Sequence, residues 1–117
     1  DAGTTLNRLL DVFPPAQQAQ IRAMVAESLR GIICQRLLPG INGGLVLACE
    51  LLLKNTAVSS LIREGKTQGL GNIMETGKAD GMIQMDASIL KLSRDRKISA
   101  QVARDAITNE MLKLQVN

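Results

Sequence analysis

The sequence predicts a mainly helical protein that carries one short antiparallel β-hairpin. The chain is 45% apolar but has Phe13 as its single aromatic residue, so its core is built from Leu, Ile, Val, Met and Ala, a mixture that favours helices. Through most of the chain, apolar residues recur every three or four positions, as in amphipathic helices. Two apolar runs separated by glycines, between residues 31 and 54, are instead typical of paired strands.

Composition also bounds the function. A length of 117 residues suits about one small domain. The net charge of +3 is mild, and the most basic stretch, residues 91–97, is interrupted by Asp95, so we expect no nucleic-acid partner. The absence of histidine excludes histidine acid–base chemistry and most zinc sites within these residues. With no signal peptide and no apolar run of transmembrane length, we expect a cytoplasmic protein that does not insert into a membrane.

Two helices are predicted before the hairpin. The first begins with Thr4 or Thr5 as its N-cap and ends at the proline pair of residues 14–15. Pro15 suits the first turn of the second helix, because its missing N–H would be unpaired there in any case. The apolar spacing extends this second helix to about Ile33.

The hairpin is predicted from GIICQRLLPG and INGGLVLACELLLKN, with a loop at residues 40–43. In a register that is symmetric about this loop, Cys34 faces Cys49. A disulfide between them is geometrically conceivable, but a reducing compartment favours free thiols.

Short helices are predicted from residue 56 to the end. Thr56 and Thr67 are the expected N-caps of the first two, and Ser99 of a later one that precedes Thr108 and a last short helix. A buried stripe on the helix between them is expected from four residues at helical spacing, namely Met82, Met85, Ile89 and Leu92.

The triplet Gly65-Lys66-Thr67 could close a phosphate-binding loop of the form G-x-x-x-x-G-K-[ST]. That loop needs an early glycine at position 60, which is Ser60. The residues before Gly65 favour a helix, so we predict that Gly65 ends this helix in the left-handed conformation. No nucleophile with an adjacent base is evident elsewhere, so no catalytic, cofactor-binding or metal-binding residue is assigned.

Three stretches closely resemble, in the same order, the C-terminal part of the PilT family. They are RLLDVFPPAQQAQIRAMVAESLRGIICQRLLP (residues 8–39), ACELLLKNTAVSSLIREGKT (48–67) and METGKADGMIQMDASILKL (74–92). The resemblance runs from about residue 6 to about residue 107, and FPPAQQAQIR and LIREGKT are its specific parts. This family comprises the twitching-motility ATPases of type IV pili, within the superfamily of type II and type IV secretion ATPases.

The resemblance implies a cytoplasmic, hexameric ATPase that uses Mg and ATP to power pilus retraction through the inner-membrane pilus machinery. In that family the catalytic motifs lie upstream of the matched region. The chain opens at Asp1, so we expect a fragment of a longer protein that hydrolyses no ATP alone. Residues 1–55 would form the edge of a RecA-like α/β core, including the hairpin, and residues 56–117 a helical subdomain.

The family also carries a motif implicated in retraction, AIRNLIRE, which is similar to residues 57–64. Matching positions are Ala57, Leu61, Ile62, Arg63 and Glu64, whereas Ser59 and Ser60 depart from it. We expect this segment to couple nucleotide-driven movement to the pilus machinery. The alternative is an ordinary packed helix with a surface ion pair.

Two further functions remain open. The Ser59 and Ser60 departures leave room for an accessory retraction or secretion ATPase paralogue, and a helical adaptor without ATPase activity is the alternative from another class. If the chain is part of a PilT-like ATPase, its hairpin lacks the core that would cover it and exposes one apolar face. That face is expected to carry either Leu45, Leu47, Leu51 and Leu53 or the residues that alternate with them on the strand.

Overall fold

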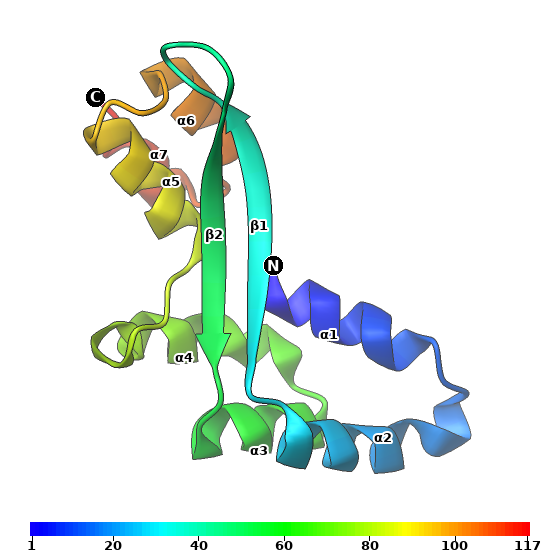
Figure 1. Cartoon of the computed structure of the whole chain (residues 1–117). Coiled ribbons are helices and arrows are strands. Elements are labelled where there is room, and N and C mark those ends of the chain that lie inside the picture. The colour runs from blue at the N-terminus through cyan, green and yellow to red at the C-terminus, as the bar shows by residue number, and fades with distance from the viewer.

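A long β-hairpin forms the axis of the protein, and helices pack along it in two groups (Figure 1). The computed structural model describes all residues, 1–117. In chain order the elements are α1 (Ala2–Asp11), α2 (Pro15–Ser28), β1 (Gly31–Pro39), β2 (Leu45–Leu53), α3 (Thr56–Glu64), α4 (Leu70–Thr76), α5 (Met85–Arg94), α6 (Ala100–Ala106) and α7 (Glu110–Lys113), with 3₁₀ turns at Thr67–Gly69 and Lys78–Asp80. The predicted mainly helical fold with one antiparallel hairpin is confirmed.

The hairpin register differs from the symmetric one by one residue. Cys34 pairs with Glu50, and Cys49 pairs with Gln35. Because successive side chains of a strand point to opposite faces, this shift places the two cysteines on different faces of the hairpin. The prediction that Cys34 faces Cys49 is therefore wrong, and both thiols are free.

Two separate buried clusters hold the helices to the inner face of the hairpin. The first lies at the open end of the hairpin and includes residues of α1, α2, α3 and α4. Its members are Ala2, Leu6, Ala26, Leu52, Val58, Ile62, Leu70, Met74 and Met82. The second lies nearer the loop and joins α5 and α6; its members are Leu38, Ala48, Ile89, Leu90, Ile98, Ala103, Ala106 and Ile107. The hairpin is thus the only element that contributes to both clusters.

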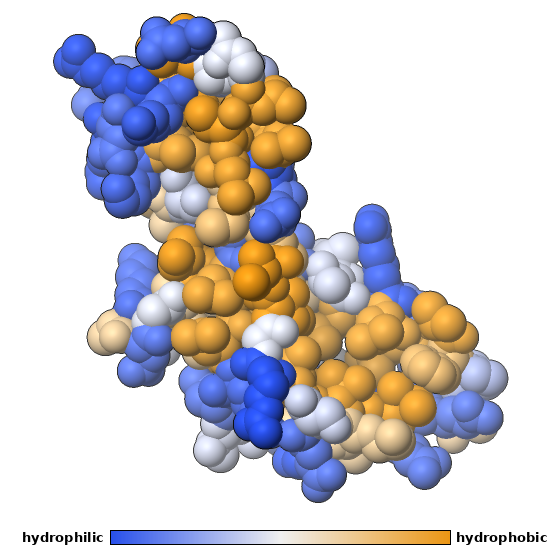
Figure 2. Space-filling model, in the orientation of Figure 1, coloured by the Kyte–Doolittle hydropathy of each residue, from blue (hydrophilic) through white to orange (hydrophobic).

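The molecule is more extended than a compact chain of its length. Its radius of gyration is 15.9 Å, whereas a compact domain of this size has about 13 Å. Only 21 of the 117 residues are buried. The hairpin's outer face is apolar and open to solvent: Ile33, Leu37, Leu45 and Leu47 are between 48% and 66% exposed, and Figure 2 shows an apolar surface along the hairpin.

Several helix boundaries differ from those predicted. The second helix ends at Ser28 and not near Ile33, because Leu29 is already extended (ψ 132°) and the strand begins at Gly31. Met82 lies before α5 and packs in the first cluster, whereas Ile89 packs in the second, so the predicted Met82-to-Leu92 stripe is divided between two cores. No helix combines the length and the apolar character needed to cross a membrane.

Most predicted N-caps also differ from the observed ones, which lie one to three residues earlier in α1 and α3. Asp1 caps α1, three residues before the predicted Thr4, and Asn55 caps α3, one residue before the predicted Thr56. The side-chain oxygen of each cap accepts a hydrogen bond from the backbone N–H three positions on. Asp and Asn serve as N-caps at least as well as Thr. Ser99 caps α6 as predicted, because its hydroxyl oxygen accepts from the N–H of Val102.

Arg96 is the single residue other than glycine with a positive φ, at 57°. It follows the last turn of α5, where the next residue, Lys97, donates its N–H to the carbonyl of Leu92. This closing geometry suits glycine, and a side chain there is strained.

Replacing Arg96 with glycine is therefore expected to raise the free energy of unfolding by about 1 kcal/mol, since relief of the strain exceeds the entropy that glycine adds to the unfolded chain. Urea denaturation under monomeric conditions measures the change. Arg104→Gly is the control, because it places glycine inside α6 and should lower the stability by a similar amount. Equal destabilisation by both substitutions would contradict the strain at Arg96.

Candidate functional site

The predicted coupling residues lie on α3, which packs against α2. Val58 and Ile62 are fully buried and Leu61 is half-buried, whereas Ala57, Arg63 and Glu64 are exposed. The helix is fixed at its start by Asn55 and, next to α2, by Ser59, whose hydroxyl donates to the carbonyl of Ala26. Its inner face is therefore core, and only its C-terminal end presents charge to solvent.

Arg63 is unengaged in this structure: it forms no hydrogen bond or ion pair with the described residues. Its neighbour Glu64 instead pairs with Lys66, 3.4 Å away. An exposed ion pair of this kind contributes little to stability. Arg63 is thus available for contact with another protein or another part of a longer chain.

The two most specific resembling stretches, FPPAQQAQIR and LIREGKT, meet in space. Arg22 of α2 lies against Gly65, and its guanidinium is 3.5–3.6 Å from the place that a Cβ of residue 65 would occupy. Gly65 ends α3 with a φ of 73°, as predicted. A side chain at position 65 would be strained by the positive φ, whereas its Cβ would meet Arg22 only at ordinary van der Waals distance. The backbone conformation is therefore what favours glycine here.

The Gly65-Lys66-Thr67 triplet does not have the architecture of a phosphate-binding loop. Such a loop precedes a helix and directs backbone N–H groups at the phosphates, whereas Gly65 here closes the helix before it. Thr67 is buried, and its hydroxyl donates to the side-chain oxygen of Asn7 at 3.0 Å. The expectation that Thr67 caps the following helix is therefore wrong, since its hydroxyl ties that segment to α1.

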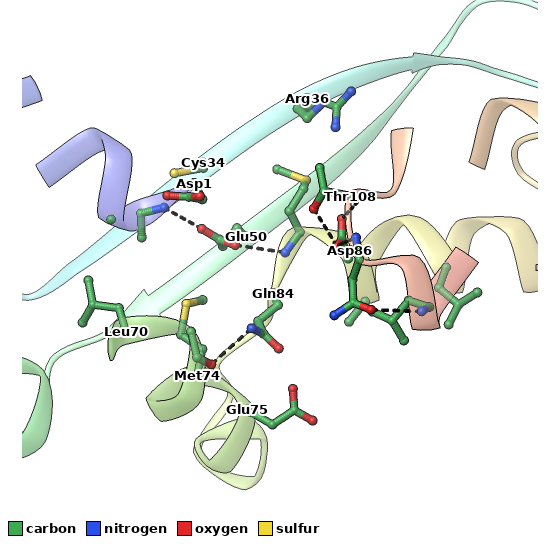
Figure 3. A pocket seen from close by; sticks show the side chains of 18 of the residues that line it. Asp1, Cys34, Arg36, Glu50, Leu70, Met74, Glu75, Gln84, Asp86 and Thr108 are labelled. Carbon is green, nitrogen blue, oxygen red and sulfur yellow. Dashed lines mark hydrogen bonds between the residues drawn. The ribbon is translucent and has the colours of Figure 1, made fainter. Parts of the chain in front are cut away.

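A groove of about 1260 Å³ separates the two groups of helices. Figure 3 shows it between α1, the hairpin, α4 and α5, with acidic and basic side chains on its walls. Glu50 lies at its centre, on the inner face of β2. No three His, Cys, Asp or Glu side chains are arranged to hold a metal ion.

Glu50 is buried, with 5% of its surface exposed. One carboxylate oxygen accepts the N–H of Ala2 at 2.6 Å, and the other accepts the N–H of Met85 at 3.1 Å. Ala2 and Met85 are the first residues of α1 and α5, so both donors are helix N-terminal groups that lack a partner within the helix. Each helix end carries roughly half a positive charge, and together they offset a buried carboxylate that would otherwise cost several kcal/mol.

Asp86 extends these contacts toward the C-terminus. It lies in the first turn of α5, and its carboxylate accepts from the hydroxyl and N–H of Thr108 and from the N–H of Asn109 at 2.9–3.1 Å. Farther along α5, Lys91 donates to Asp95 at 2.7 Å and so lowers the pKa of Asp95, with a smaller contribution from the charge of Lys97. Asp86, but not Asp95, therefore joins separate segments of the chain.

Sequence reasoning missed Glu50 and the packing of Arg22. The available signal for Glu50 was a lone charged residue inside the apolar run LVLACELLL, a position that suggests a compensated buried charge. Arg22 had no comparable signal, because its contact with Gly65 depends on how α2 and α3 cross.

No family model matches the chain. It is 39% identical over 109 residues to a twitching motility protein of Neisseria gonorrhoeae, and the aligned region covers 92% of this chain and 29% of the relative. It is 36% identical over 104 residues to the type IV pilus retraction ATPase PilT of Pseudomonas aeruginosa, covering 89% of this chain and 30% of the relative. A crystal structure of the pilus retraction motor PilT with bound ADP superposes with a TM-score of 0.79 at 39% identity, over 93% of this chain and 30% of that one.

These relatives define the class of protein: the chain is a homologue of the ATPases of twitching motility and pilus retraction. More closely, it is homologous to the C-terminal region of PilT, as its sequence resemblance indicated. The chain spans only about 30% of the length of the relatives it matches.

Proposed function

We propose that this chain is the C-terminal part of a motor ATPase that retracts type IV pili. The observation that carries the proposal is the match of nearly the whole chain to the retraction motor PilT at 39% identity. The complete protein would bind and hydrolyse ATP with Mg through residues upstream of this part. The contribution of this part would be subunit packing and mechanical coupling.

The complete protein would act as a hexamer in the cytoplasm, attached to the inner membrane through the pilus machinery. Residues 1–55 would complete the edge of its ATPase core, and residues 56–117 would form a helical subdomain. The open apolar face of the hairpin supports this division, because it is the surface that the remaining core would cover.

The coupling role is assigned to Ala57, Leu61, Ile62, Arg63 and Glu64 on α3. The buried Ile62 and half-buried Leu61 would hold the helix to the motor, and the unengaged Arg63 would contact the pilus machinery. This division of labour gives α3 one face that follows the motor and one end that acts on a partner.

In the full-length protein, Arg63→Ala is expected to leave ATP turnover within about twofold of the unsubstituted value and to abolish most pilus retraction, because an exposed, unpaired side chain contributes little to folding. Turnover is measured on purified protein and retraction by twitching of cells. Arg8→Ala, at an exposed position in the last turn of α1, is the matched control and should affect neither. Normal retraction with Arg63→Ala would reject the coupling role.

Two other functions can be distinguished from that of the retraction motor. The Ser59 and Ser60 departures from AIRNLIRE favour an accessory paralogue as the nearest alternative, and retraction that persists without this protein would support it. A free-standing adaptor would lack an upstream phosphate-binding loop in its reading frame.

A further inference from the structure

We propose that Glu50 is a positioning residue that transmits a movement of α1 to α5. It would thereby couple the two groups of helices. The inference rests on the proposed function, since nucleotide exchange in the complete protein would supply the displacement. Glu50 is the one buried charged side chain of the fold, and it lies on the one element shared by both buried clusters.

On the α1 side, Glu50 is the principal polar link to the hairpin. The N–H of Ala2 reaches it at 2.6 Å, whereas the other polar contact of α1 with the hairpin is a long one of 3.7 Å between Thr5 and Cys34. A shift of the first turn of α1 therefore either breaks the bond to Glu50 or moves the carboxylate.

On the α5 side, the same carboxylate holds the first residue of the helix. Met85 donates to it at 3.1 Å, and flanking contacts hold the segment to β2: Leu51 exchanges two backbone hydrogen bonds with Ile83, and Ser88 accepts the N–H of Cys49. A displaced Glu50 carboxylate would therefore pull on the first turn of α5, whose flanking residues are also bonded to β2.

From α5 the contacts continue to the C-terminal segment. Asp86, next to Met85, holds Thr108 and Asn109 with three hydrogen bonds. Two carboxylates thus connect the starts of α1, α5 and α7 across the groove in Figure 3. Such a chain of contacts is a physical route for coupling.

The test is hydrogen exchange of the full-length protein with and without ADP. In the unsubstituted protein, ADP is expected to change protection of residues 2–10 and of residues 85–94 together. In Glu50→Gln one oxygen becomes an NH₂ group that cannot accept, so at least one of the two hydrogen bonds to the helix starts is lost. The response of residues 85–94 should then fall on the order of tenfold, while that of residues 2–10 persists.

Glu75→Gln is the matched control, because Glu75 lines the same groove but is exposed and pairs only with Lys78. A purely structural role for Glu50 would change basal exchange and leave the ADP-dependent difference intact, which would overturn the inference. If Glu50→Gln does not fold, the unsubstituted protein still tests the inference. An ADP-dependent change in protection of only one of the two segments, or of neither, overturns the inference. Failure of the full-length protein to bind ADP would instead reject the proposed function.

Discussion

The isolated 117-residue chain is expected to self-associate through the outer face of the hairpin. Ile33, Leu37, Leu45 and Leu47 expose large apolar side chains on adjacent strands, and β1 forms an uncovered edge of a two-stranded sheet. Contiguous apolar surface next to an unpaired strand edge favours pairing with a second copy. Sedimentation velocity at micromolar concentration should therefore show dimers or larger species.

Replacing Leu37 with lysine and Leu47 with glutamate is expected to return the chain to a monomer. These two residues pair directly across the hairpin, so the introduced charges attract each other and preserve the register. We expect association to weaken at least tenfold, since burial of two leucines contributes about 3 kcal/mol or more.

Leu114→Lys with Met111→Glu is the matched control, because both residues are exposed but lie at the C-terminal end, away from the outer face. This control should leave association unchanged. A monomeric unsubstituted chain that unfolds cooperatively would show that the outer face needs no covering.

The fold class could be predicted because local patterns determine it. Glycines at residues 43 and 44 adopt the positive φ that the hairpin loop requires, and Gly65 ends α3 as its flanking residues indicate. Ser99 caps its helix for the same reason, since the cap bond involves only residues three positions apart. Information of this kind lies within a few residues of sequence.

The details that failed depend on contacts between distant segments. Strand register is one: a shift of a single residue separates Cys34 from Cys49, and packing of the inner face decides it. The division of Met82 and Ile89 between two cores is another, because helical spacing continues through a segment that the β-bridge of Ile83 keeps extended.

The candidate site was predicted only in part. The helical segment that the resemblance singled out for coupling is α3, and the buried Ile62 and exposed Arg63 lie where an amphipathic helix would place them. Its coupling role stays a prediction. The contacts of Glu50 could not be predicted, because its partners are 48 and 35 residues away and are backbone N–H groups, which leave no trace in the side-chain sequence.

The decisive measurement is ATP turnover by this chain and by the full-length protein, side by side. We expect the full-length protein to hydrolyse ATP and the 117-residue chain to show no turnover above background. The reason is that the single G-K-T triplet closes a helix and cannot cradle a phosphate. Specific turnover by the isolated chain would contradict the account, as would a full-length protein that neither binds nor hydrolyses ATP.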